Sequence, residues 1–71
     1  MEGSAAKEPI MQFFAFEHLP PPLQIVSREF AKMAEFIVVT LPRNAERTVA
    51  LRKLLESKDA AVRAKIAKTD E

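Results

Sequence analysis

The stretch Leu41-Pro-Arg-Asn-Ala-Glu46 predicts that the chain reverses its direction. Because proline disfavours helical geometry in the residue before it, Pro42 predicts that a preceding helix ends near Leu41. Asn44 is a strong helix N-cap, and Glu46 in the following turn interacts favourably with the helix dipole. We therefore expect a tight turn over residues 41–44 that joins two helices.

Upstream of this turn, apolar residues recur at steps of three and four, the spacing of a helix that packs against another helix. These residues are Leu23, Val26, Phe30, Met33, Ile37 and Leu41. The prolines at 20–22 cannot lie inside a helix, but the last of them suits a first helical turn. The sequence predicts a helix over about residues 22–40.

Downstream of the turn, a second apolar stripe predicts a longer helix over about residues 45–68. Its members are Leu51, Leu55, Val62 and Ile66. Because the connection between the helices is so short, they are expected to lie antiparallel. The predicted fold class is all-α, with a two-helix hairpin as its main element.

The predicted hairpin leaves apolar residues without a partner. Ile25, Phe36 and Val39 lie off the stripe of the first helix. A chain of 71 residues without cysteine builds only a marginal core and has no disulfides to stabilise it. We therefore expect the hairpin to assemble into a compact homo-oligomer.

The N-terminal region has a different character. Residues 1–12 have mixed charges and no helical or strand period, which predicts a flexible tail. The cluster Phe13-Phe-Ala-Phe16 is too short for a stable helix and predicts an aromatic arm that docks onto the hairpin. Residues 13–71 are thus expected to form a single helical hairpin domain with its docking arm.

Composition argues against catalysis and cofactors. The chain has no cysteine and a single histidine, His18, so no zinc site of the usual kind is expected. Its one glycine, Gly3, excludes a glycine-rich phosphate loop, and no nucleophile stands beside a base. His18 is better explained as a capping or docking residue than as a general base. We expect a protein that is not an enzyme and needs no cofactor.

Two further features bear on location and partners. The apolar run 36–41 is far shorter than a membrane span, and Met1-Glu-Gly-Ser lacks the features of a signal peptide, so a cytoplasmic protein is expected. Residues 43–68 carry eight Lys or Arg against three acids, although the net charge is only +1. Since these basic positions form no continuous stripe, a DNA or RNA polymer is not the expected partner.

Several residues could bind an anion. Arg47 and Thr48 lie in the first turn of the second helix, where free N–H groups and a guanidinium suit phosphate. The alternative is that Arg47 pairs with Glu46, or with Asp70 of a neighbouring subunit. Lys32 lies on the side of Ile25 and Phe36, where an amine at a subunit seam would attract an anion.

Arg63 and the aromatic arm each allow two interpretations. Arg63 ends a series with Arg52, Glu56 and Asp59 at i,i+4 and i,i+3 spacing, so it either completes an exposed ladder of ion pairs or faces an anion between subunits. The phenylalanines of the arm either belong to the core or leave one ring, such as Phe16, free to stack on a nucleobase.

The segments Phe16-Glu-His-Leu-Pro20 and Asn44–Ala64 resemble the hairpin domain shared by phage anti-CBASS and anti-Thoeris nucleotide sponges. The resemblance is greatest to the anti-CBASS cyclic-oligonucleotide sponges. It implies a helical homo-oligomer, typically a hexamer, in the host cytoplasm. Such a protein captures cyclic di- and trinucleotide immune signals without cleaving them, so that host effectors are not activated.

The resemblance also implies roles for individual residues. Phe16 matches the arm aromatic that stacks on a base of a cyclic dinucleotide, and Lys32 is the nearest match to a phosphate-binding lysine. Arg47 matches the arginine that opens the second helix, and Arg63 resembles a residue of the trinucleotide site. The chain departs from the longer sponges in having no Trp and only a four-residue turn before the second helix. The alternative function is a structural or protein-binding oligomeric hairpin without a nucleotide ligand.

Overall fold

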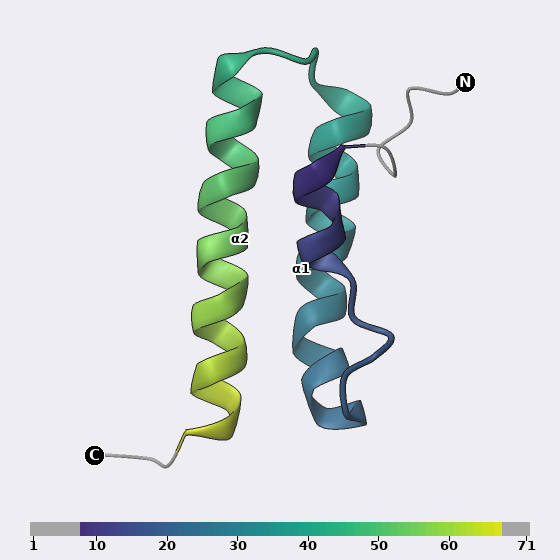
Figure 1. Ribbon diagram of the computed structural model, residues 1–71, viewed down its shortest axis with the longest axis vertical. Helices are drawn as coiled ribbons and strands as arrows, with labels where there is room; N and C mark the ends of the chain where they lie inside the picture. The colour runs from purple at the N-terminus through teal and green to yellow at the C-terminus, as the bar shows by residue number, and fades with distance from the viewer. Residues whose placement is uncertain (1–7, 68–71) are drawn as a thin grey trace.

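The computed structural model describes residues 8–67 and contains three helices. A 3₁₀ helix, η2, spans Pro9–Phe14, and the two long helices are α1 (Pro21–Thr40) and α2 (Ala45–Ile66). Helices α1 and α2 lie side by side and antiparallel, and η2 packs against both of them (Figure 1). Over the described part of the chain there is no strand, so the predicted all-α hairpin is confirmed.

Local sequence sets the helix ends as expected. Helix α1 begins at Pro21, one residue before the predicted start, with Pro20 as its N-cap. It ends at Thr40 because Leu41, the residue before Pro42, is extended. Helix α2 follows the Asn44 N-cap and ends at Ile66, whereas the predicted end, Lys68, lies outside the described residues.

The core of a single chain is small. Phe14 of η2, Ala34 of α1 and Leu51 of α2 are its buried apolar residues, so each helix contributes one. Partly buried apolar side chains from all three helices pack around them, namely Ile10, Met11, Phe30, Ala31, Ile37, Val38, Leu54 and Leu55. The N-terminal segment is therefore part of the core.

The buried face of α1 differs from the predicted stripe. Met33 and Leu41 were expected to face α2 but are 48% and 42% exposed, whereas Ser27 and Ala34 are fully buried. Small side chains let helices approach closely, and the true helical period of 3.6 residues shifts the contact from position 33 to position 34. The sequence interpretation had favoured the larger side chains.

The flexible tail predicted over residues 1–12 is wrong for its last part. Residues 9–12 belong to η2, and Glu8 is buried. The order comes from tertiary contacts, which a search for local periodicity cannot detect. Residues 1–7, like residues 68–71 at the end of the predicted domain, lie outside the described part.

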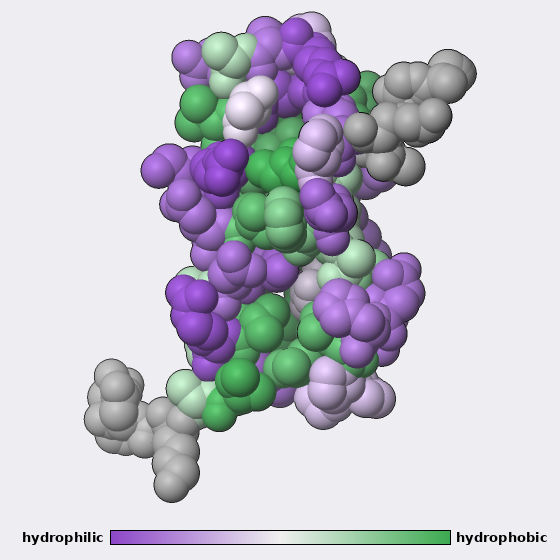
Figure 2. Space-filling model, viewed as in Figure 1, coloured by the Kyte–Doolittle hydropathy of each residue, from purple (hydrophilic) through white to green (hydrophobic). Residues whose placement is uncertain are grey.

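The second apolar set of α1 is exposed on the single chain, as the spacing predicted. Ile25, Phe36 and Val39 are 60%, 58% and 72% exposed. On the face that carries η2, by contrast, hydrophobic side chains gather along the middle between hydrophilic edges (Figure 2). Within residues 8–67, no helix is both long and apolar enough to cross a membrane.

Candidate functional site

Arg47 is buried where the two long helices join, and all its recorded contacts are within the chain. Its guanidinium donates to Glu8 Oε2 at 2.6 Å and to the carbonyl oxygens of Val38 at 3.0 Å and Leu41 at 3.4 Å. Only 4% of the Arg47 side chain and 9% of the Glu8 side chain are exposed. Arg47 thus neutralises a buried carboxylate and caps the C-terminal end of α1, whose last carbonyls lack helical partners.

The other groups at the start of α2 are also engaged internally. The Asn44 side chain accepts a hydrogen bond from the Arg47 backbone N–H at 2.9 Å. The Thr48 hydroxyl donates to the Asn44 carbonyl at 3.2 Å. The phosphate site expected from Arg47 and Thr48 would therefore have to break these contacts. Within the described residues the carboxylate partner of Arg47 is Glu8 and not Glu46, whereas the other expected partner, Asp70 of a neighbouring subunit, lies outside the described part.

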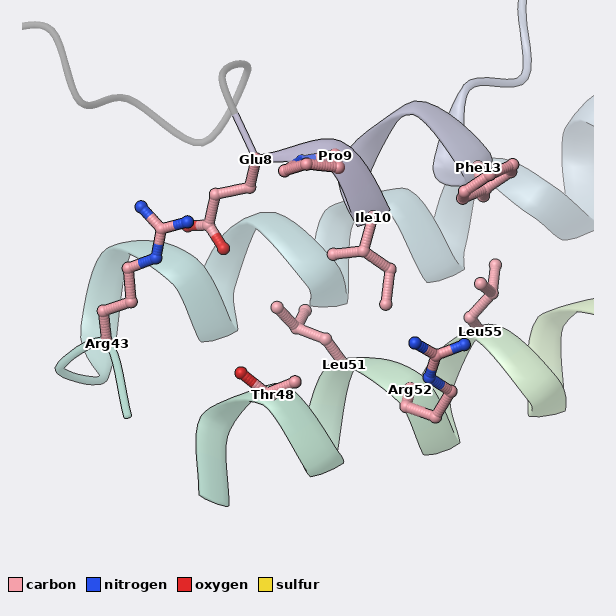
Figure 3. A pocket seen from close by; sticks show the side chains of 9 residues that line it. All are labelled: Glu8, Pro9, Ile10, Phe13, Arg43, Thr48, Leu51, Arg52 and Leu55. Carbon is pink, nitrogen blue, oxygen red and sulfur yellow. The ribbon is translucent and has the colours of Figure 1, made fainter. Parts of the chain in front are cut away.

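Two cavities lie between the N-terminal segment and α2, and both include Phe13 in their linings. The corner cavity, near the turn between the long helices, has a volume of about 320 Å³. It is lined by Glu8, Pro9, Ile10, Phe13, Arg43, Thr48, Leu51, Arg52 and Leu55 (Figure 3). The open-end cavity has a volume of about 400 Å³ and is lined by Gln12, Phe13, Ala15, His18, Leu19, Lys58, Asp59, Val62 and Arg63.

The open-end cavity combines an apolar floor with cations. Phe13, Leu19 and Val62 supply apolar surface, while His18 and Arg63 are exposed at the same cavity. Lys58 is half-buried here and pairs with Asp59 at 2.9 Å. Because this pair neutralises itself, and no ion pair of Arg63 is recorded among residues 8–67, the Arg63 guanidinium is the remaining charge of the lining.

The predicted ladder of ion pairs on α2 is not recorded among residues 8–67. The pairs on that helix are instead Lys53 with Glu56 at 3.8 Å and Lys58 with Asp59 at 2.9 Å. Arg52 and Arg63 each line a cavity. The second interpretation of Arg63, a residue that faces an anion between subunits, stays a prediction.

Phe16 and Lys32 lie outside both linings. Phe16 is partly exposed in the loop after η2, which Gln24 ties to α1 by donating to the carbonyls of Glu17 and Leu19. Lys32 is exposed on α1 and pairs with Glu29 at 3.3 Å. Together with Ile25 and Phe36, the Lys32–Glu29 pair follows one stripe of the helix at steps of three and four. Within a single chain, Lys32 and Arg63 are thus not brought into one cavity.

Sequence reasoning missed the contributions of Glu8, Arg43 and Arg52 to this region. Glu8 was assigned to the tail, and nothing local to it indicates a partner 39 positions away. The signal that could have indicated Arg43 and Arg52 is their place in the positively charged half of the chain. Their common cavity depends on η2, which was not expected.

Compared with known protein families, curated proteins and solved structures, the chain gives no match. Among residues 8–67, no three His, Cys, Asp or Glu side chains are grouped so that they could hold a metal ion. The candidate site is therefore defined by its own chemistry, which is apolar and aromatic surface beside guanidinium and imidazole groups.

Proposed function

We propose that this chain binds and sequesters cyclic di- and trinucleotides, without cleaving them, as a phage protein that blocks immune signalling in the host cytoplasm. The observation that carries the proposal is the lining of the open-end cavity. Arg63 and His18 stand there beside the Phe13 ring, with Leu19 and Val62 as apolar surface. Aromatic surface suits a nucleobase, and a guanidinium suits a phosphate.

The chemistry of this cavity favours binding over cleavage. Its lining has no Ser, Thr, Cys or Tyr that could serve as a nucleophile. Among the described residues, His18 has no recorded hydrogen bond to a carboxylate that would orient it as a base. A protein that only sequesters a nucleotide needs a surface on which a base can stack and hydrogen-bond donors for its phosphates. The cavity supplies both, through Phe13 and through Arg63 and His18.

A homo-oligomer, with a hexamer as the expected form, is part of the proposal. Ile25, Phe36 and Val39 expose an apolar stripe on α1, and the Lys32–Glu29 pair lies within it. Burying this stripe between subunits would place Lys32 at the seam, where its amine would face a phosphate. The cyclic dinucleotide site would then consist of Phe16 and Lys32 at an interface, separate from the trinucleotide site at Arg63.

The exposed stripe also favours a second candidate, a structural or protein-binding hairpin with no nucleotide ligand. Large apolar side chains exposed along one side of a helix in a small protein are typical of an interaction surface. Under this alternative, the stripe and the aromatic arm serve assembly or docking onto another protein. It differs from the first candidate in predicting no affinity for any cyclic nucleotide.

The test is calorimetry with a cyclic dinucleotide and a cyclic trinucleotide on three variants. Arg63→Ala should weaken trinucleotide binding and spare the dinucleotide, whereas Lys32→Ala should do the reverse. Loss of a charge-assisted contact costs about 1.5–3 kcal/mol, or about 10- to 150-fold in affinity. Lys65→Ala, an exposed change on α2 outside both linings, is the matched control and should change neither affinity.

The outcomes separate the candidates. No heat with either ligand would support the protein-binding alternative, and equal weakening of both ligands in both variants would show one shared site. Ligand released by heating should be chromatographically intact, since recovery of a linear product would reveal an enzyme. Binding that falls steeply with salt would indicate a loose polyelectrolyte contact instead of an enclosed site.

A further inference from the structure

The outer stripe of α1 is a row of side chains on the side of the helix away from the core. Its members are spaced alternately by three and four residues and are Pro22, Ile25, Glu29, Lys32, Phe36 and Val39. At 3.6 residues per turn, this row lies opposite Ser27 and Ala34, the buried residues of α1. The spacing is that of a seam along which two helices pack. Since all its members are exposed, this seam is unoccupied in the described part of the chain.

The order of residues along the outer stripe is self-complementary. Apolar residues stand at both ends, and the opposite charges of Glu29 and Lys32 stand at the centre. In a two-fold pair, a contact from one position to a second position on the partner is always matched by the reverse contact. With antiparallel helices and the axis between positions 30 and 31, the facing residues are Glu29 and the partner's Lys32, Ile25 and the partner's Phe36, and Pro22 and the partner's Val39.

Charge selects this arrangement over its competitors. In a parallel pair in register, Glu29 would face the partner's Glu29, and such like-charge contacts oppose association. Shifting the antiparallel pair by one heptad would set Lys32 against an apolar residue of the partner and leave its charge unpaired. In the unshifted antiparallel pair, by contrast, each Lys32 amine has its own Glu29 at 3.3 Å and the partner's Glu29 opposite. Four charges of alternating sign then meet at the axis.

The residues beside the outer stripe fit the same register. Arg28 and Glu35 each directly precede a member of the stripe, are exposed, and have no recorded ion pair among residues 8–67. Arg28 is displaced by only about 3 Å along the helix axis from the partner's Glu35, which long side chains can span. On the other edge, Met33 is 48% exposed and comes beside the partner's Val26, which would cover it.

From this complementarity we infer that the outer stripe is a two-fold interface between copies of this chain, in which α1 packs antiparallel on α1 and Glu29–Lys32 pairs across the axis fix the register. A second copy is the occupant because the stripe carries the complement of its own charges. The inference rests on the homo-oligomer of the proposed function, for which it names the contact surface, and it is independent of the ligand. The assembly then has an even number of subunits.

The experiment is sedimentation equilibrium on the full chain and on charge variants. Glu29→Lys and Lys32→Glu each turn two attracting contacts across the axis into repelling ones, and each should weaken self-association at least about tenfold. An equal mixture of the two variants should associate as the parent chain does, because unlike charges face each other again. The double variant should also recover. Glu56→Lys, an exposed change of equal charge on α2, is the matched control and should associate normally.

Engineered thiols test the register, since the chain has no cysteine of its own. A mixture of Ile25→Cys and Phe36→Cys chains should form a disulfide-linked dimer on mild oxidation, because these positions face each other. The second Ile25–Phe36 contact of that dimer stays intact. Neither variant alone should cross-link, since two copies of either position lie about 16 Å apart along the axis, beyond the reach of a disulfide.

Four results would overturn the inference. They are a parent chain that stays monomeric at submillimolar concentration, unchanged self-association in both single charge variants, no recovery in their mixture, and cross-linking of Ile25→Cys alone, which would indicate a parallel pair. Failure of the proposed function is distinguishable. A chain that pairs in this register but gives no heat with cyclic nucleotides would support the interface and contradict the ligand, whereas a monomer that binds cyclic nucleotides would do the reverse.

Discussion

The two ends of the hairpin use the same residue type for different purposes. At the closed end, where α1 turns into α2, Arg47 is 5% exposed and bound to Glu8 and to the last carbonyls of α1. At the open end, Arg63 is exposed beside a cavity. An arginine whose two terminal guanidinium nitrogens are bound within the chain, as in Arg47, stabilises the fold, and one without such partners is available to a ligand. The role of each arginine is therefore decided by which groups of the chain lie within reach of its guanidinium, more than by its position on the helix.

The largest effect that separates the two ends should be on stability. Arg47→Ala leaves the Glu8 carboxylate buried without its partner, and breaking a buried pair in this way costs about 3–5 kcal/mol. Arg63→Ala, an exposed change, should alter the free energy of unfolding by less than about 0.5 kcal/mol. Urea denaturation monitored by circular dichroism measures both.

Equal midpoints for these two variants would show that the Glu8–Arg47 pair does not stabilise the native state. The reciprocal change Glu8→Gln provides a check on the mechanism. Because Gln keeps an oxygen acceptor for the guanidinium, it should destabilise the chain less than Arg47→Ala does.

A smaller effect is expected from the helix cap at the closed end. Asn44→Ala removes the side-chain acceptor of the Arg47 N–H and should cost about 1 kcal/mol, within the ~0.5–2 kcal/mol seen for such changes. Asn44→Asp keeps an acceptor at the same position and should preserve the midpoint in urea. If Asn44→Asp is as unstable as Asn44→Ala, the side-chain oxygen is not the cause.

At the open end a buried polar group lacks a partner, so a substitution there should stabilise the chain. Ser27 is fully buried, and its hydroxyl has no hydrogen-bond partner. Ser27→Ala removes this unpaired group and also improves helix propensity, for an expected gain of about 1 kcal/mol. Ser57→Ala on the exposed side of α2 changes propensity alone and should gain less. A loss of stability in Ser27→Ala would mean that the hydroxyl is bonded.

The sequence predicted the helices well because their signals are local. Pro42 and Asn44 specify the turn, and the three- and four-residue spacing specifies the long helices. The closed end could not be predicted in the same way, because the partner of Arg47 is 39 positions away in a segment with no periodic pattern. The buried face of α1 was predicted incorrectly in part, because the prediction relied on large apolar residues. Ala34 is small and was not included, yet it is fully buried.

The candidate site was predictable only in part. Arg63 was singled out as a residue with two interpretations, and in the structure it lines the open-end cavity, while its role in binding stays a prediction. The second wall of both cavities is η2, whose order depends on Phe14 and Glu8 packing against distant parts of the chain. Charge pattern alone therefore identified the positive half of the chain but not the cavities that its arginines flank.

The smallest expected effect on stability comes from Asp59→Asn, which tests the open end by its charge. Lys58 and Asp59 are 2.9 Å apart, but Asp59 is 49% exposed, and a pair of this kind contributes only about 0–1 kcal/mol. The midpoint in urea should therefore barely change.

The cavity lining gains one net positive charge, since Lys58 is no longer neutralised. At about 1 kcal/mol for a charge near a partner in water, affinity for a cyclic trinucleotide should rise by up to about fivefold. Glu56→Gln, an exposed carboxylate on α2 outside both linings, provides the matched control for the change in net charge. The same gain in both variants would show that the ligand responds to the overall charge of α2, and that the open-end cavity is not its site.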